Sequence, residues 1–390
     1  MEKRFKNTKF ELWEVIAITL FSSLVMSFCT GYLVYKGYGC NKYNGDDEYL
    51  ANFYKSYEEI VDNYYSSVDK SALIDAGIKG MLNYLGDPYT TYLDKNGTDS
   101  LKESLSGTYE GVGVAITLNS EKEVVVSKVY ENTPAEKAGV KEGDIILSIN
   151  GESLEEKTTT DAVEIIKGLE DIVLICRRDN ENVEIKLNKA TLNVPSVNTK
   201  IEDINNKKIG YMYVSKFNQT VYDQFVHALE KLEKDNMDGL VIDLRDNTGG
   251  YLAAATKMAK LFLENGKVIY SLNEKNGSTV SKDDTDEART YPVYVLVNGN
   301  TASASEILAA ALRDSYGAKL VGSTTYGKGK VQKTSTLSDG TMYKYTSAKW
   351  LTPNGLCIDE VGLKPDIEID ASADYTKDLV YNAAMDAISK

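Results

Sequence analysis

The sequence predicts an α/β protein with four parts: a mostly parallel, helix-covered sheet, a β-rich domain, an N-terminal helical segment and one transmembrane helix. Residues 195–372 alternate near-continuous apolar strands with amphipathic helices, a pattern typical of parallel sheets covered by helices. Residues 97–190 instead carry short strand-like runs interrupted by one helical run. Residues 15–35 are 21 consecutive residues without a charge, enough for a membrane-spanning helix.

The transmembrane helix is predicted at residues 15–35, which as a helix would cross about 30 Å of hydrocarbon. Four basic residues precede this segment, whereas acidic residues accompany the lysines that follow it. The positive-inside rule therefore predicts that residues 1–14 form a cytoplasmic tail and that the rest of the chain is extracytoplasmic. A cleaved signal peptide is the alternative, but its apolar region usually has only about 7–15 residues. We expect a single-pass protein of the cell membrane.

The composition argues against several classes of function. The net charge of −14 makes the chain a poor partner for a phosphate backbone, so no nucleic acid is expected. The four cysteines form no C-x-x-C pair and the chain has one histidine, so we expect neither a metal site nor another cofactor. That histidine, His227, lies in the middle of an amphipathic helix beside its apolar face. It is expected at the surface, which disfavours a Ser-His-Asp triad.

Helices are also predicted at both ends of the part that follows the membrane segment. Residues 45–95 carry apolar residues at three- and four-residue spacing, and Gly86 and Pro88 are expected to end the second of their helices. These helices could form a small packed bundle or could pair between subunits in a homodimer. Residues 373–390 predict a C-terminal helix, which would either take part in such pairing or cover the core.

Three polar or glycine-rich loops follow predicted strands within residues 195–372: "RDNTGG" (245–250), "NGNTASAS" (298–305) and "STTYGKGK" (323–330). In parallel α/β sheets, chemistry gathers in loops beyond the carboxyl ends of the strands. We therefore expect the functional site at these loops. The last of them nearly matches a phosphate-binding loop, but Gly329 stands where a hydroxyl is required and β-structure follows instead of a helix. Nucleotide binding is therefore disfavoured.

Ser303 and Lys328 each have two interpretations. Ser303 and Glu306 fit the spacing of a capping box, in which the serine begins a helix. A helix start after a strand also stabilises a developing negative charge, as a nucleophile requires. Lys328 is either a solvated lysine in a glycine loop or a buried amine. To act as a base near neutral pH, its pKa would have to fall by about 3 units from about 10.4.

Taken together, these motifs resemble the carboxyl-terminal processing peptidases, the tail-specific Ser-Lys proteases. "TASASEILAAAL" and "TYGKGKVQ" are similar to the family's S/T-A-S-A-S-E and F-G-K-G-x-V-Q, and "DLRDNTGG" is similar to D-L-R-x-N-P-G-G. The resemblance implies that Ser303 is the nucleophile, that Lys328 is the general base and that Gln332 orients the lysine. It also implies that the backbone amides of Gly250 and Ala304 form the oxyanion hole.

Two positions depart from the family motifs. Thr248 replaces the usual proline, which affects the geometry between strand and loop, and Tyr326 replaces the usual phenylalanine, which keeps an aromatic ring beside the lysine. The resemblance covers roughly residues 50–370, in the family's order of helices, binding domain and catalytic core.

The β-rich domain resembles a PDZ domain, on the motifs "YEGVGVAI" and "NTPAEKAGVKEGDIILSINGESL". The resemblance implies that the loop of Gly111, Val112, Gly113 and Val114 binds a peptide's terminal carboxylate through its amides. The bound peptide would then add as a strand to the edge of the sheet. The implied partners are protein or peptide substrates with free C-termini.

The sequence thus predicts a membrane-anchored serine endopeptidase. Its PDZ domain (97–190) would recognise protein C-termini, and its core (195–372) would cleave peptide bonds with a Ser-Lys dyad. The alternative is a catalytically silent PDZ scaffold or sensor that binds the C-termini of exported proteins. Such a scaffold would be expected to have lost at least one site residue, whereas serine, lysine, glutamine and both glycines are all present.

Overall fold

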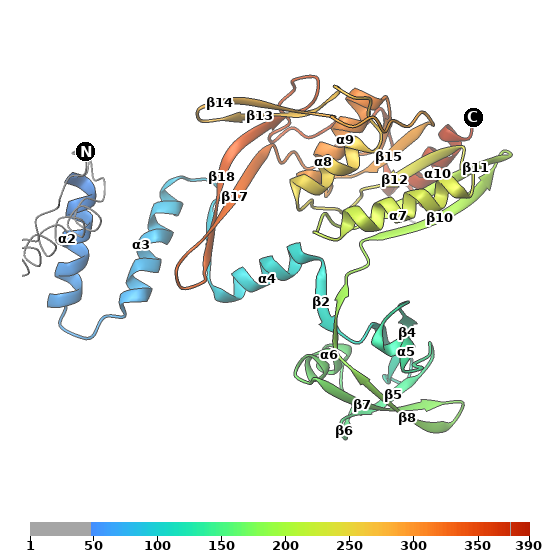
Figure 1. Ribbon diagram of the computed structural model, residues 1–390, viewed down its shortest axis with the longest axis horizontal. Helices are drawn as coiled ribbons and strands as arrows, with labels where there is room; N and C mark the ends of the chain where they lie inside the picture. The colour runs from blue at the N-terminus through green and yellow to red at the C-terminus, as the bar shows by residue number, and fades with distance from the viewer. Residues whose placement is uncertain (1–47, 375) are drawn as a thin grey trace, which may run out of the picture. The chain divides into compact units, whose positions relative to one another are not determined.

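The computed structural model describes residues 48–374 and 376–390 (Figure 1). The chain divides into two compact units, residues 1–78 and residues 79–390. The cytoplasmic tail and the transmembrane helix predicted at residues 15–35 lie outside the described residues. Within the described part of the chain, no helix has both the length and the apolar character needed to cross a membrane.

The described part of the first unit is helical. It contains α2 (Glu48–Asn63) and the first half of α3 (Lys70–Tyr84). Several large apolar side chains of α2 are exposed, among them Tyr49, Phe53 and Tyr54. A helix that leaves such side chains uncovered within its own unit has an apolar surface available for another partner.

Two elements at the start of the second unit differ from the prediction. Thr91–Leu93, within the segment expected to be helical, forms the short strand β1 and pairs with β18 (Met342–Leu351). Lys95–Ser106, which overlaps the region expected to be β-rich, forms the helix α4. Its ends carry recognisable signals, because Asp94 caps the first turn through Gly97 N–H and Gly107 ends the helix at a φ of 70°.

A β-rich domain follows α4 (Figure 1). Its main sheet has the strand order β3-β4-β5-β7-β8, with β6 paired to β5. The strands that precede and follow this sheet along the chain, β2 and β9, pair with each other in a separate two-stranded ribbon. The elements are β2 (Thr108–Gly111), β3 (Val114–Leu118), β4 (Val124–Val129), α5 (Pro134–Lys137), β5 (Ile145–Ile149), β6 (Glu152–Ser153), α6 (Thr159–Lys167), β7 (Asp171–Arg178), β8 (Glu181–Asn188) and β9 (Ala190–Asn193). The core contains apolar side chains of the sheet and of both helices, such as Ala135, Leu174 and Ala162.

The sheet within residues 197–368 is mostly parallel, as predicted. Its order is β10-β11-β12-β15-β16-β19, and only the β10–β11 pair is antiparallel. The strands are β10 (Val197–Ile204), β11 (Lys207–Val214), β12 (Gly239–Asp243), β15 (Val293–Val297), β16 (Lys319–Gly322) and β19 (Ile367–Glu368). The central strands are buried along nearly their whole length, which explains their continuous apolar sequences.

Helices cover both faces of this sheet. Alternate residues of β12 face opposite layers, because Leu240 and Ile242 pack with α7 to α9 whereas Val241 packs with α10. The helices are α7 (Val221–Lys234), α8 (Leu252–Lys260), α9 (Ala304–Ala311), which continues into the π-helical turn η1 (Leu312–Tyr316), and α10 (Leu379–Ile388). A single 3-10 turn, η2 (Ala371–Ala373), precedes α10.

An antiparallel sheet lies beside the parallel one (Figure 1). Its order is β1-β18-β13-β14, with β17 paired to β18, and its remaining strands are β13 (Val268–Glu274), β14 (Gly277–Lys282) and β17 (Lys330–Thr336). β17 begins two residues after Lys328 and runs along β18. The loop that contains Lys328 is therefore fixed at its C-terminal end by the pairing of β17 with β18.

Candidate active site

The three loops singled out in the sequence meet at the carboxyl ends of β12, β15 and β16. Asp246 binds the loop after β15, since its carboxylate accepts hydrogen bonds from the side-chain amides of Asn298 (3.0 Å) and Asn300 (2.8 Å). The loop after β16 is attached through Tyr326 N–H, which donates to the carbonyl of Thr301 (3.0 Å). The parallel topology therefore brings together the three loops, 245–250, 298–305 and 323–330, in which the site was expected.

Ser303 occupies the turn between β15 and α9, in a conformation that is unusual for a residue other than glycine. Its φ is 57° and its ψ is −117°. A capping serine normally has an extended backbone, so this geometry is not that of an ordinary helix cap. Backbone strain of this kind costs about 1–3 kcal/mol and is concentrated at functional sites, including the strand-to-helix turns that expose a nucleophilic serine. The half-buried Ser303 thus has the backbone of a presented nucleophile.

The carboxylate of Glu306 connects the Ser303 turn to the lysine loop. Its Oε2 accepts hydrogen bonds from the backbone N–H groups of Ser303 (2.8 Å) and Lys328 (2.9 Å). Its Oε1 accepts hydrogen bonds from the Thr325 hydroxyl (2.5 Å) and from Gly327 N–H (2.8 Å). Burial raises the pKa of Glu306, and these four donors oppose the rise. The capping-box spacing indicated the bond to Ser303, but no sequence signal indicated the contacts with the second loop.

Lys328 lies on closely packed backbone. A Cβ on Gly327 would come within 2.8 Å of Gly362 N, and one on Gly329 would lie 2.6 Å from the Cβ of Asp359, so both flanking positions need glycine. The carbonyl of Lys328 accepts a hydrogen bond from Trp350 Nε1 (2.9 Å). The loop therefore holds the lysine at a defined place on the antiparallel sheet.

The amine of Lys328 is half-buried and its pKa is lowered. Burial lowers the pKa most and the charge of Lys344 lowers it further, whereas the carboxylates of Glu306 and Asp87 raise it. The ammonium lies over the ring of Tyr89, 4.8 Å from the centroid. No hydrogen bond between this amine and the Ser303 hydroxyl is present among the described residues. The loop backbones are thus joined while the two side chains are not.

Gln332 lies on β17 and, among the described residues, makes no hydrogen bond with the lysine amine. Its side-chain amide donates a hydrogen bond to the carbonyl of Lys330 (3.1 Å). The structure therefore brings Ser303 and Lys328 to one site through their backbones, but it does not place Gln332 in the orienting contact that the resemblance implies.

The backbone amides of Gly250 and Ala304 border the Ser303 turn. Gly249, at a φ of 92°, packs so closely that an added Cβ would lie 2.9 Å from Ala304 N. Ala304 is the first residue of α9, so its N–H has no partner within the helix. Neither this N–H nor that of Gly250 makes a hydrogen bond to another described residue. Two donors are therefore available beside the serine.

In the β-rich domain, the loop from Gly111 to Val114 connects β2 to β3. Gly113 has a φ of 90°, and an added Cβ would lie 2.2 Å from the Cβ of Thr133, so only glycine fits. Val112 is buried, and its carbonyl accepts a hydrogen bond from Ala135 N–H (2.9 Å). The loop is thus held against the start of α5, with a backbone conformation that is set by packing.

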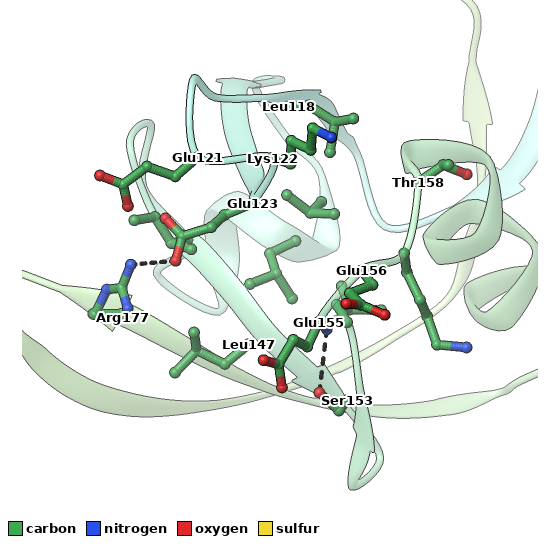
Figure 2. Close-up of a pocket in the computed structure, with 15 residues that line it drawn as sticks. Leu118, Glu121, Lys122, Glu123, Leu147, Ser153, Glu155, Glu156, Thr158 and Arg177 are labelled. Atoms are coloured by element: carbon green, nitrogen blue, oxygen red, sulfur yellow. Dashed lines mark hydrogen bonds and ion pairs between the residues drawn. The ribbon is translucent and has the colours of Figure 1, made fainter.

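An open pocket in the same domain contains none of the predicted site residues (Figure 2). Its rim includes the ion pair between Arg177 and Glu123 (2.6 Å), and its floor contains apolar side chains of β4 and β5. His227, the only histidine of the chain, is exposed on α7. The expectation of a surface histidine is confirmed.

Comparisons with known proteins identify the parts of the chain. Residues 208–369 match the model of peptidase family S41, residues 101–175 match that of the PDZ domain, and residues 38–97 match the "activating protease CtpB N-terminal domain". Along the chain, the N-terminal domain match comes first, the PDZ match second and the peptidase match last.

Relatives match over most of the chain. The "carboxy-terminal processing protease CtpA" of Bacillus subtilis is 37% identical over 313 residues, which are 79% of this chain and 66% of that protein. A "probable CtpA-like serine protease" of Staphylococcus aureus (strain N315) is 34% identical over 376 residues, 94% of this chain and 74% of that protein. The chain therefore spans about two thirds to three quarters of the length of these relatives.

Solved structures show the same fold. A "photosystem II D1 C-terminal processing protease" is similar with a TM-score of 0.50 at 28% identity, over 82% of this chain and 86% of that one. A putative S41 protease from Bacteroides fragilis has a TM-score of 0.53 at 18% identity, over 84% and 98% of the two chains, and supports the fold alone. The chain belongs to peptidase family S41 and is a serine-type peptidase with a PDZ domain, of the carboxyl-terminal processing kind.

Proposed function

We propose that this chain is a membrane-anchored endopeptidase that cleaves peptide bonds with a dyad of Ser303 and Lys328. The observation that carries the proposal is the Glu306 carboxylate, which binds the backbones of both residues through one oxygen. The strained backbone of Ser303 and the lowered pKa of Lys328 support the same assignment.

In the proposed reaction, the hydroxyl of Ser303 attacks the scissile carbonyl carbon while the neutral amine of Lys328 accepts its proton. The amides of Gly250 and Ala304 donate hydrogen bonds to the resulting oxyanion. The lysine ammonium then protonates the leaving amine, and a water that the lysine deprotonates hydrolyses the acyl-enzyme. The amine first has to leave the ring of Tyr89 and turn toward the serine. In that position, Gln332 would orient it.

The PDZ domain is proposed to select the substrate by its C-terminus. The amides in the loop from Gly111 to Val114 would bind the terminal carboxylate, and the preceding residues would add to the sheet edge. Residues 15–35 would anchor the chain with residues 1–14 in the cytoplasm, so the substrates would be proteins outside the cytoplasm. Pairing of two copies through the exposed apolar side chains of α2 is the proposed basis of a homodimer.

The test compares the full-length wild type with Ser303→Ala on peptides that carry either a free or an amidated C-terminus. We expect the wild type to cleave the free peptide faster than the amidated one, and the variant to cleave neither while keeping the thermal stability of the wild type. Full activity of Ser303→Ala would refute the nucleophile. A wild type that binds the peptide with a free C-terminus but fails to react with a fluorophosphonate would instead indicate a silent scaffold.

A further inference from the structure

The ring of Tyr89 lies against two lysines of the active-site loop and its strand. The ring centroid is 4.8 Å from Nζ of Lys328 and 5.4 Å from Nζ of Lys330. Tyr89 lies in residues 85–90, the segment between α3 and β1. This segment is more than 200 positions from the two lysines in the sequence. An ammonium group within about 6 Å of an aromatic face is attracted by the ring's electrons.

The segment that carries Tyr89 is fixed to the antiparallel sheet. The carboxylate of Asp87 accepts hydrogen bonds from the hydroxyls of Thr90 (2.7 Å) and Thr346 (2.5 Å), and it lies 3.5 Å from Nζ of Lys330. Thr346 N–H donates in turn to the Thr90 hydroxyl (3.1 Å), which is buried. These partly buried hydrogen bonds fix the segment that carries the ring, so Tyr89 does not sit on a free surface loop.

Tyr89 is also kept neutral. Burial, the neighbouring Tyr326 hydroxyl and the charges of Asp359 and Asp87 raise the pKa of Tyr89 to about 12. The ring thus keeps a neutral face toward the lysines at ordinary pH.

We propose that Tyr89 is a positioning residue for the general base: its ring holds the protonated amine of Lys328 away from Ser303 and releases the amine once it is neutral. The proposal rests on the proposed role of Lys328 as the base. It explains why the two loops are joined through their backbones while the amine lies on an aromatic face and not on the serine hydroxyl.

The groups around the amine determine the sign of the effect. Lys344 on β18 repels the ammonium, whereas Glu306 on α9 and Asp87 beside Tyr89 attract it. The second lysine at the ring is Lys330 on β17. The ring attracts only the charged form, because a neutral amine has no cation–π interaction. Tyr89 therefore favours the protonated lysine, and its removal lowers the pH at which the lysine becomes a base.

The test measures how the rate of Ser303 labelling by a fluorophosphonate depends on pH, in the full-length chain. For Tyr89→Leu we expect the acidic limb of the curve of labelling rate against pH to move to lower pH by about 0.5–1.5 units. This shift corresponds to the loss of one cation–π contact. Tyr89→Phe keeps the aromatic face and should keep the wild-type limb. Tyr89→Trp has a stronger face and should move the limb to higher pH. A merely structural role cannot produce shifts of opposite sign.

Ser303→Ala and Lys328→Met are measured alongside, and circular dichroism checks folding. If Lys328→Met labels as the wild type does, the base assignment and the inference both fail. If Lys328→Met is inert but Tyr89→Leu and Tyr89→Trp keep the acidic limb of the wild type, only the role of Tyr89 is refuted. Should Tyr89→Leu not fold, Tyr89→Phe is compared with Tyr89→Trp. Acidic limbs at the same pH for these two variants would overturn the proposal.

Discussion

Lys328 donates its backbone N–H to the Oε2 atom of Glu306 at 2.9 Å, across 22 positions of sequence. The same oxygen accepts the N–H of Ser303 at 2.8 Å. A buried carboxylate that accepts several backbone donors fixes the distance between the segments that supply them. The spacing of the proposed nucleophile and base therefore depends on a third side chain, which a motif of serine and lysine alone does not reveal.

Replacing Glu306 by glutamine is expected to disturb both loops. Glu306 accepts four hydrogen bonds, two on each oxygen. In glutamine an NH₂ group replaces one of these oxygens, so two of the donors lose their acceptor, and each buried donor without an acceptor costs about 1–3 kcal/mol. We expect a drop in thermal stability and a fall in cleavage rate of about 10²-fold, because small displacements of reacting groups are costly. Thermal melts and cleavage rates check this, with the exposed Glu264→Gln as the matched control. Wild-type stability and rate in Glu306→Gln would contradict the role of the carboxylate.

The pH dependence of cleavage should report the pKa of Lys328. Only the neutral amine accepts a proton, so the rate rises as pH rises through this pKa, which burial and the charge of Lys344 place below the ordinary value of 10.5. Lys328→Arg should lose about 10²–10⁴-fold in kcat/KM, since a guanidinium does not give up its proton. Lys333→Arg, on the strand β17 that follows Lys328, should retain its rate. An active Lys328→Arg enzyme would show that another group is the base.

Gly250→Ala is expected to disrupt the proposed oxyanion hole. An added Cβ would lie 2.0 Å from the carbonyl oxygen of Phe217, so the backbone at residue 250 has to move. Loss of one oxyanion donor costs about 10²–10³-fold in kcat. Gly277→Ala is the matched control, because Gly277 has the same φ of 145° but open space around the new Cβ. Equal activities of the two variants in a cleavage assay would argue against a role for the Gly250 amide.

The buried pair of Asp144 and Arg178 is expected to stabilise the PDZ domain. Burial raises the pKa of Asp144. The two hydrogen bonds from Arg178 (2.7 Å each) and the one from Lys141 N–H outweigh this rise, so the net pKa is below the usual value. A carboxylate with a lowered folded-state pKa contributes stability above its unfolded pKa and loses it as pH falls through the folded value. The contribution should therefore be complete at pH 7 and weaken under acid.

Asp144→Asn should destabilise this domain by about 3 kcal/mol at pH 7, the lower part of the range for a broken buried pair, because Arg178 can reach water. Hydrogen exchange of residues 171–188 in the whole chain, followed by mass spectrometry, measures the stability of this domain separately from that of the other parts. The difference from the wild type should shrink at pH 3. Glu123→Gln, which breaks the more exposed pair with Arg177, should have a much smaller effect. A difference that grows under acid would contradict the assigned sign.

Much of the fold could be predicted because its signals are local. The apolar strands of the parallel sheet and the amphipathic α7 are recognisable from spacing alone, and so are the loops that follow the strands. Local signals also exist for α4, in Asp94 and Gly107, but the β-rich character of the neighbouring runs obscured them. β1 lies after the expected helix end at Gly86 and Pro88 and was not predicted as a strand. Its three residues gain their structure from pairing with residues 342–344, and no local pattern encodes such a partner.

By itself, the sequence determined the family motifs and the residues proposed as nucleophile and base, since these depend on residue type and near neighbours. Only the tertiary structure decided which groups surround them. The four-donor contact of Glu306 joins residues 303 and 328, and the ring of Tyr89 reaches Lys328 from a segment 239 positions earlier. The physical reason is that burial, hydrogen-bond satisfaction and the charge near an amine all arise from chain segments that meet only on folding.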